Sequence, residues 1–345
     1  MYFPSQFDYM HRRASIQKQT DVSTMLAKHV FFSKFESTES NPNDANMVFS
    51  PLSIQIILGL IAAGSSADGS TMGGPRLSVA NGAWIDQTLD FNPSFKQVMD
   101  NVYKAAAASV DFQNKAEEKT NGLIKKILPP DAVDGTTSLV LGNALYFKGA
   151  WTEKLNASDT KDHEFHLLNT GVSVQAPFMT RKKWQYVKVY NGFKVLRLPY
   201  KQGEDKRFLS MYMFLPNDRD GLPALMEKIN SKPGFLDQHA PLQQVRVRKF
   251  LIPKFKISFG IEASKVLKGL GLTLPFIGGL TEMVANNFPL AVSKVFHKSF
   301  IEVNEEGTEA AAVTFATMLC GSSMMMVKEE EIDFVVDHPF LFCER

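Results

Sequence analysis

Hydrophobic residues follow a helical spacing in three parts of the chain. Residues 21–32 and 261–272 have apolar positions three and four apart, and the second segment ends at glycine. A continuous apolar run predicts a buried helix over residues 54–63, shortly after Pro51, a residue favoured in the first turn of a helix. In the first helix, the side chains expected to face the core are Met25, Leu26, Val30 and Phe31.

Most of the remaining hydrophobic residues have the composition or spacing of β-strands. Runs rich in aliphatic and aromatic residues, some alternating with charged ones, fit strands that lie half-buried in a sheet. Helices early and strands later predict an α+β protein built on sheets. Neither repeats nor a low-complexity linker divide the chain, so we expect a single domain over residues 1–345. The predicted strands lie within residues 76–86, 139–151, 174–200, 208–217, 244–260 and 331–342.

Composition narrows the possible partners. The 345 residues are 44% hydrophobic and 21% charged, as is usual for a globular protein, and a net charge of +2 gives no basis for binding nucleic acid. The longest apolar run is well short of the roughly 20 residues that span a bilayer, so we expect no membrane partner. The N-terminal segment has an acid, a histidine and two arginines before any sustained apolar run, which is not the layout of a secretory signal. We therefore expect a cytoplasmic protein.

The sequence lacks the patterns of an enzyme or a metalloprotein. His163 and His166 lie three residues apart without a third ligand in view, so a strand with alternating polar residues is the better interpretation. The two cysteines, Cys320 and Cys343, form neither a disulfide framework nor a metal-ligand pattern, and no base accompanies Cys320. We therefore expect no enzymatic activity and no cofactor or metal.

Four motifs resemble, in the same order, those of one protein family. The sequences are MVFSPLSI at residues 47–54, NALYFKGAW at 143–151, FHKSFIEVNEEGTEA at 296–310 and DHPFLF at 337–342. They resemble the serpins, which are mechanism-based inhibitors of serine proteases, and are most similar to plant members of the Z type. The resemblance implies a serpin fold, in which helices pack around large, mostly antiparallel β-sheets and a reactive-centre loop is exposed. An extracellular location is the alternative that the family suggests.

The resemblance places the reactive-centre loop at about residues 305–328. In serpins, a loop that a protease has begun to cut enters the central sheet as an extra strand and traps the protease, an established example of strand addition. The family's polar cluster beneath that sheet, which helps to control its opening, matches Ser50, Ser53, Asn143 and His297, and Trp151 matches a position near the top of the sheet. The implied hinge comprises Glu305, Glu306, Gly307, Thr308, Glu309, Ala310, Ala311 and Ala312.

Small residues recur at every second position from Thr308 to Ala316 of this loop. Alternate side chains of a strand face the same side, so if Thr308 faces the core, the even-numbered residues after it do too. A large side chain at such a position would cost ~1–3 kcal/mol by overpacking. Gly307 is expected to be the pivot, and a helix after it is the alternative interpretation. The inward residues would be Thr308, Ala310, Ala312, Thr314 and Ala316.

The reactive bond is placed by the family's usual loop length. Counting from Gly307 puts it between Gly321 and Ser322, and no basic residue lies between residues 309 and 327, so a trypsin-like target is not expected. The implied partner of the monomer is a chymotrypsin- or elastase-like serine protease, or a papain-like cysteine protease. The alternative positions for the bond are Leu319, Cys320 and Met324.

The chain departs from the family pattern in three places. It omits a helical stretch near residues 69–73 and part of a helix within residues 111–126, and relatives continue with two buried strands beyond the position of residue 345. These differences support an alternative function. The chain would then be a non-inhibitory serpin relative, namely a protease substrate, a binding protein or the product of a decaying gene.

Overall fold

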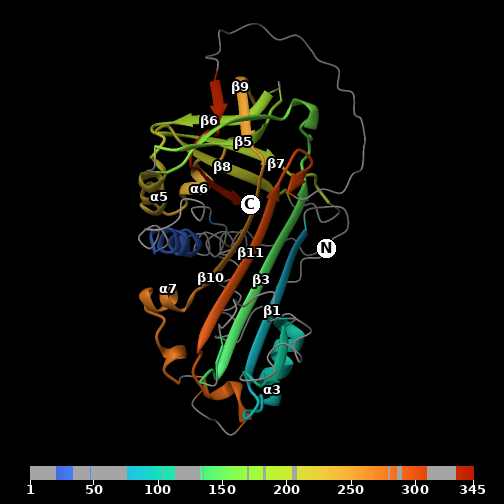
Figure 1. Ribbon diagram of the computed structural model, residues 1–345, viewed down its shortest axis with the longest axis vertical. Helices are drawn as coiled ribbons and strands as arrows, with labels where there is room; N and C mark the ends of the chain where they lie inside the picture. The colour runs from blue at the N-terminus through green and yellow to red at the C-terminus, as the bar shows by residue number, and fades with distance from the viewer. Residues whose placement is uncertain are drawn as a thin grey trace, which may run out of the picture.

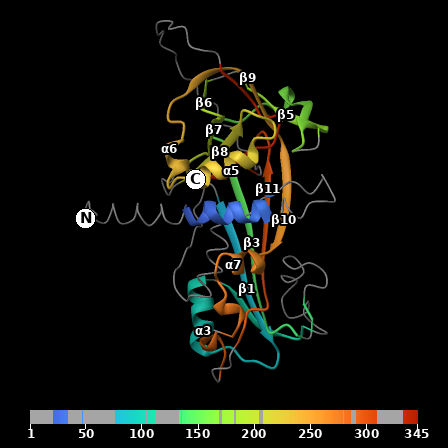
Figure 2. The ribbon, with the colours of Figure 1, turned by 90° about the vertical axis from the view of Figure 1, so that its left-hand side faces the viewer.

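The computed structural model describes most of the chain between residues 21 and 345. The described residues are 21–33, 47, 76–103, 105–112, 133–134, 136–168, 171–181, 184–203, 208–278, 280–285, 290–308 and 332–345. The first helix covers residues 21–33 and lies at mid-height of the molecule (Figures 1 and 2). The predicted helix over residues 54–63 lies outside the described residues.

A long six-stranded sheet runs along the lower and middle parts of the molecule (Figure 1). Its strand order is β10-β11-β12-β3-β1-β2. Neighbouring strands are antiparallel, except that β1 pairs with β2 in parallel and β11 also pairs with β3 in parallel. The bounds are β1 Arg76–Asp86, β2 Ala106–Val110, β3 Leu139–Ala150, β10 Phe255–Glu262, β11 Lys294–Val303 and β12 Gly307–Thr308.

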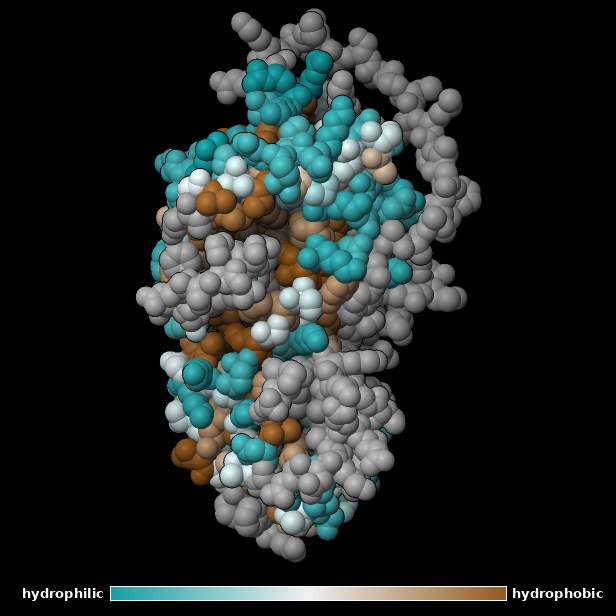
Figure 3. Space-filling model, in the orientation of Figure 1, coloured by the Kyte–Doolittle hydropathy of each residue, from teal (hydrophilic) through white to brown (hydrophobic). Residues whose placement is uncertain are grey.

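An eight-stranded sheet forms the upper part of the molecule. Its main path is β14-β8-β7-β6-β9-β5-β4, and β13 pairs with β9 off this path. Hydrophilic residues cover much of this end, whereas a band of hydrophobic residues is visible at mid-height (Figure 3). The bounds are β4 Lys161–His166, β5 Ser173–Met179, β6 Trp184–Tyr190, β7 Phe193–Pro199, β8 Ser210–Pro216, β9 Val245–Pro253, β13 Ile332–Val335 and β14 Leu341–Glu344.

Short helices cover the two sheets. Two of them pack on one face of the eight-stranded sheet, where Leu225 of α5 and Phe235 of α6 meet Phe193, Val195 and Phe214. Other short helices lie in the lower half, among them α3 and α7 (Figures 1 and 2). The bounds are α3 Pro93–Val98, η2 Met99–Tyr103, η4 Ala157–Asp159, α5 Leu222–Asn230, α6 Phe235–Gln238, α7 Ser264–Gly269, η5 Leu274–Phe276 and η6 Thr281–Met283.

The core has a lower and an upper part. In the lower part, Ile85, Leu141 and Val295 from the long sheet pack with residues of the lower helices. In the upper part, the ends of β3 and β11 pack against the eight-stranded sheet, for example through Phe147 and Val303. The upper ends of β3 and β11 therefore connect the core of the long sheet with that of the eight-stranded sheet.

The strand predictions were mostly correct, but two predicted strands are divided. Residues 76–86 form β1 as expected, whereas residues 244–260 split at Lys254 into β9 and β10, which belong to different sheets. Residues 331–342 likewise contain β13 and the start of β14. Met25 was wrongly placed in the core, since it is 41% exposed while Leu26 is 2% exposed. Alternation along a chain shows which residues are buried, but not when a strand leaves one sheet for another.

Candidate functional site

The candidate site lies where β3 and β11 meet in the middle of the six-stranded sheet. In the lower part the two strands pair directly, from Lys294 opposite Val140 to Phe300 opposite Tyr146. In the upper part β12 lies between them and pairs with both. We call the boundary between residues 140–150 of β3 and residues 294–303 of β11 the seam.

One face of the seam is turned toward the core. Along β11, every odd-numbered residue from Val295 to Val303 is buried. On β3, Leu141 and Phe147 belong to the same hydrophobic clusters as these residues. Any strand inserted into the seam would therefore have to turn alternate side chains toward a closely packed core.

Two residues of the predicted hinge already lie in the seam. Gly307 is opposite Ala150, and Thr308 is opposite both Gly149 and Val303, with antiparallel pairing on each side. Thr308 is 0% exposed, so its side chain faces the core, as the sequence analysis assumed. The upper seam thus has the pairing of a three-stranded sheet, although only two residues of the middle strand take part.

A tight turn brings β12 back beside β11. The Asn304 side-chain Oδ1 accepts hydrogen bonds from the backbone N–H groups of Glu306 (2.9 Å) and Gly307 (3.2 Å), an arrangement that suits asparagine in turns. Gly307 has φ +156°, and a Cβ there would lie 2.1 Å from the Gly149 carbonyl oxygen. Gly307 is therefore needed because the backbone of β3 occupies the space of a side chain.

Polar contacts fix the two glutamates of the turn. The Glu305 carboxylate accepts hydrogen bonds from Thr160 Oγ1 (2.7 Å) and Lys254 Nζ (3.0 Å). Burial alone would raise the pKa of Glu305, but these hydrogen bonds and the Lys254 charge outweigh it and hold the pKa below its ordinary value. Glu306 forms an ion pair with Lys154. Both carboxylates therefore tie the turn to neighbouring segments.

Beneath β12, Thr308 meets a buried aromatic pair. Its Oγ1 lies 2.7 Å from the Tyr200 hydroxyl, which donates to Glu344 Oε1 at 2.9 Å, so the Thr308 hydroxyl is the donor to Tyr200. Burial raises the pKa of Tyr200 well above its ordinary value. Trp151 stacks on Tyr200 with ring centroids 4.7 Å apart, and its Nε1–H donates to the Asn304 carbonyl oxygen at 2.9 Å. Trp151 therefore contacts both the turn and the residue beneath the hinge.

The lower seam is closed by a row of polar side chains. Asn81, Asn143 and His297 are opposite one another on β1, β3 and β11. Asn143 Nδ2 donates to Asn81 Oδ1 at 2.6 Å, and Asn143 Oδ1 lies 3.1 Å from His297 Nδ1, which must then donate. Burial lowers the pKa of His297 to about 4, so the ring is neutral near pH 7.

The structure groups some of the predicted site residues and does not describe others. Glu305, Glu306, Gly307, Thr308 and Trp151 meet at the upper seam, and Asn143 and His297 meet at the lower seam. Sequence reasoning missed Asn81, Tyr200, Asn304 and Glu344, although an amide side chain within the otherwise apolar run at residues 79–85 was a usable signal for Asn81. The predicted residues outside the described part are Ser50, Ser53, Glu309, Ala310, Ala311, Ala312, Leu319, Cys320, Gly321, Ser322 and Met324.

Comparison with known proteins identifies the family to which this chain belongs. The family model described as serpin (serine protease inhibitor) matches residues 70–345. This chain is a serpin. The predicted family and fold are thereby confirmed, and the family is one of protease inhibitors rather than enzymes.

The similar proteins include plant serpins of the Z type. The chain is 51% identical to Serpin-ZX of Arabidopsis thaliana, with 96% of this chain and 94% of the relative covered. It is 48% identical to Serpin-ZXA of Oryza sativa subsp. japonica, with 96% and 93% covered. Among solved structures, Arabidopsis AtSerpin1 in its native stressed conformation matches with a TM-score of 0.80 and 49% identity, covering 96% of this serpin and 94% of that chain.

The alignments also confirm that this serpin is internally shortened. The alignment with Arabidopsis Serpin-ZX spans 379 positions, more than the 345 residues of this chain, so the relative has residues without a counterpart here.

In the part of the chain that the structure describes, no group of three or more His, Cys, Asp or Glu side chains could hold a metal ion. No described helix is long and apolar enough to cross a membrane.

Proposed function

We propose that this serpin inhibits an endopeptidase by inserting its cleaved reactive-centre loop into the seam between β3 and β11. The observation that carries the proposal is the position of β12, which is paired with both strands at the top of the seam. Lengthening β12 would replace one parallel ladder between β3 and β11 with two antiparallel ladders. This would add backbone hydrogen bonds of the more favourable kind.

If the register of β12 continued through an inserted loop, each later residue would have a defined place. Continued downward from Thr308, it sets Ala312 between Leu145 and Ser299, Thr314 between Asn143 and His297, and Ala316 between Leu141 and Val295. Each of these three pairs of seam residues is a directly opposed pair of β3 and β11. The loop would thus separate existing partners without shifting either strand along its axis.

The side chains of the loop suit these places. The even-numbered residues from 310 to 316 would follow Thr308 onto the core side of the seam, and they are all alanine or threonine. Because the core side is already closely packed, a large side chain there would cost ~1–3 kcal/mol and a charge more. The odd-numbered positions, which include Glu309 and Phe315, would face away from this core. The alternation of size supports insertion by these residues.

Insertion would have to open the polar row at the lower seam. Thr314 would enter between Asn143 and His297, whose side chains are 3.1 Å apart. A threonine hydroxyl can donate one hydrogen bond and accept others, so it can replace the contact that it breaks. Asn143 and His297 would then keep the lower seam closed until the loop enters and replaces their hydrogen bond.

The sequence of the reactive-centre loop supports a proposal about the class of the target protease. We propose Gly321–Ser322 as the reactive bond, with Leu319, Cys320 and Met324 as alternatives. The absence of a basic residue between positions 309 and 327 favours a chymotrypsin-, elastase- or papain-like target over a trypsin-like one.

The test is a denaturing gel after mixing the serpin with a protease of each class. Trapping predicts an adduct of the combined mass that survives heating. Thr308→Arg should give only cleaved serpin, because it places a charge at a fully buried position of the upper seam. Glu302→Arg is the matched control, since Glu302 is partly exposed beside Lys256 on the outer side of β11, and it should still form the adduct. Unchanged adduct formation by Thr308→Arg would refute insertion.

A second candidate function is a non-inhibitory serpin that proteases merely cleave or that binds another molecule. The internal shortening favours it, because missing segments reduce the packing that holds an unrelaxed sheet together. The same gel separates the two functions. Cleavage by every protease class without any adduct would support the second.

A further inference from the structure

Glu344 lies in an apolar row of the eight-stranded sheet. It is opposite Met211 on β8, and Met211 is opposite Leu198 on β7. Met211 is 0% exposed and Leu198 is 2% exposed, and both belong to the upper core. Although Glu344 as a residue is partly exposed at the sheet edge, its carboxyl group reaches the buried Tyr200 hydroxyl.

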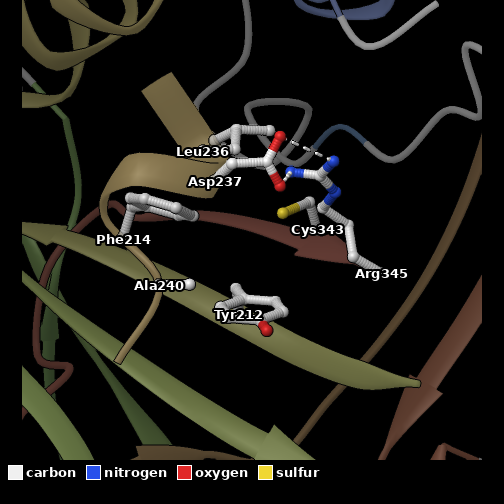
Figure 4. A pocket seen from close by; sticks show the side chains of 7 residues that line it. All are labelled: Tyr212, Phe214, Leu236, Asp237, Ala240, Cys343 and Arg345. Atoms are coloured by element: carbon white, nitrogen blue, oxygen red, sulfur yellow. Dashed lines mark hydrogen bonds and ion pairs between the residues drawn. The ribbon is translucent and has the colours of Figure 1, made fainter. Parts of the chain in front are cut away.

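The opposite face of β14 borders a small cavity of about 100 Å³. Figure 4 shows Cys343 and Arg345 on this face, with the Arg345 guanidinium turned toward Asp237 of α6. Arg345 Nη1 lies 2.7 Å from Asp237 Oδ1, so these two charges compensate each other. None of the described residues forms such an ion pair with Glu344, which lies between Cys343 and Arg345 in the chain but points the other way.

A chain of hydrogen bonds connects Glu344 to the hinge. Thr308 donates to Tyr200, and Tyr200 donates to Glu344, over distances of 2.7 Å and 2.9 Å. Tyr200 can serve both neighbours because a phenol has one hydrogen to donate and can accept another. A side chain of β14 thereby fixes the hydroxyl on which β12 rests, although the two strands belong to different sheets.

We propose that Glu344 is a positioning residue for the hinge, which holds Thr308 in the seam through Tyr200 and releases it when its carboxyl becomes charged. The consequence for inhibition rests on the proposed function, in which docking of β12 is the first step of loop insertion. The docking itself can be measured without a protease.

The direction of the pH effect follows from burial. Burial raises the pKa of Glu344 to about 8, against which the hydrogen bond from Tyr200 acts only weakly. The docked state therefore prefers the neutral carboxyl, and docking is complete at acid pH and weakens as the pH rises toward 8. If the undocked carboxyl has an ordinary pKa, docking weakens by up to about tenfold per pH unit in this interval.

Few other titratable groups face the Glu344 carboxyl among the described residues. Tyr200 does so directly, and its own pKa is raised by burial and by Glu344. Met211 and Leu198, on the strands packed beside it, do not titrate. Behind the strand, burial raises the pKa of Cys343 to about 12, and Arg345 is paired with Asp237. Glu344 is the group here whose ionisation ends by about pH 8, so a transition with a midpoint at or below that pH is assigned to it.

The test uses the fluorescence of Trp151, which stacks on Tyr200 and bonds to the turn before β12. The intact protein is titrated from about pH 5 to about pH 9.5 without protease, which spans the expected transition. We expect a change in emission with a midpoint at or below about pH 8. Glu344→Gln should abolish it, because the amide keeps an acceptor for Tyr200 but cannot ionise.

Two controls make this titration decisive. Glu164→Gln removes an exposed carboxyl on β4 and should leave the transition in place, whereas Trp151→Phe should remove the signal. A Glu344→Gln variant that titrates like the wild type, or a wild type without any transition, would overturn the proposal. Thr308→Val, which loses only the hydroxyl, should also uncouple the hinge and serves as a second variant.

A kinetic arm separates this inference from the proposed function. The fraction of serpin trapped rather than cleaved is compared between wild type and Glu344→Gln, with the same protease, at pH values on either side of the transition. The wild type should trap a smaller fraction at the higher pH, and the variant should not change. If neither protein forms an adduct, the proposed function fails while the Trp151 titration still decides the role of Glu344.

Discussion

The two ends of the seam between β3 and β11 differ in what closes them. At the upper end, Gly307 and Thr308 already lie between the strands. At the lower end, β3 and β11 pair directly, and Asn143 joins Asn81 and His297 across three strands. The sheet is thus open where a loop would enter and closed by polar contacts where the loop would finish. A strand can lengthen downward only if the lower contacts give way.

The buried titratable groups also differ between the two ends. His297 at the lower end has a pKa lowered to about 4, and Glu344 beneath the upper end has a pKa raised to about 8. Burial is the main cause in both cases and keeps both groups neutral near pH 7. The two ends should therefore be weakened by opposite changes of pH.

The largest expected effect comes from closing the upper end to β12. In Gly307→Val, the new Cβ would fall 2.1 Å from the Gly149 carbonyl oxygen and 2.7 Å from Ala150 Cα, so β12 must leave the seam. We expect a loss of about 3 kcal/mol in the free energy of unfolding, the upper end of overpacking costs, and no adduct formation. Urea unfolding measures the loss of unfolding free energy, and the denaturing gel measures adduct formation.

Gly260→Val is the matched control for that variant. Gly260 lies on the edge strand β10, and a Cβ there would meet only the His297 carbonyl oxygen, at 4.0 Å. Its unfolding free energy should change far less. Equal losses in the two variants would mean that the position of β12 is not what makes Gly307 special.

The next effect is expected at the lower end. Asn143→Ala would remove the shared partner of Asn81 and His297 in a buried row, at a cost of about 1–3 kcal/mol for each polar group left without a partner. The exposed Asn191, in the turn between β6 and β7, provides the control variant Asn191→Ala. If Asn143→Ala is as stable in urea as Asn191→Ala, the polar row does not close the lower seam.

A smaller effect should distinguish neighbouring positions of the loop. If the register of Gly307 and Thr308 continues through an inserted loop, Ala312 would face the core side of the seam and Ala311 the opposite side. Ala312→Leu should destabilise the inserted form by ~1–3 kcal/mol and shift the outcome from adduct toward cleaved serpin, whereas Ala311→Leu should not. If both variants behave alike on the gel, the inward positions have been assigned incorrectly.

The effect expected to be smallest at neutral pH is the acid sensitivity of the lower end, because it develops only as the pH falls. Because the folded pKa of His297 is below the ordinary value of 6.5, the unfolded chain binds a proton first as the pH falls. Stability should then decrease between about pH 6.5 and pH 4, by at most about 1.4 kcal/mol per pH unit. His297→Gln should reduce this slope in urea unfolding, while His29→Gln, at an exposed position, should not.

Local patterns in the sequence predicted some features of the seam and missed others. The strand at residues 76–86 and the inward orientation of Thr308 follow from alternation, which is a property of a single strand. Tyr200 and Glu344 could not be found this way, because they meet Thr308 only when two sheets pack together. The division of residues 244–260 between two sheets was hidden for the same reason. Motif resemblance supplied Asn143 and His297, and the structure supplied the contact between them.

The most direct test of insertion is the heat stability of the serpin before and after cleavage of its loop. A protease that cuts within residues 317–324 would free the residues that we propose to enter the seam. We predict that the nicked protein unfolds at a distinctly higher temperature than the intact one, because a full strand then joins β3 and β11. An unfolding temperature that stays the same or falls after cleavage would contradict the account.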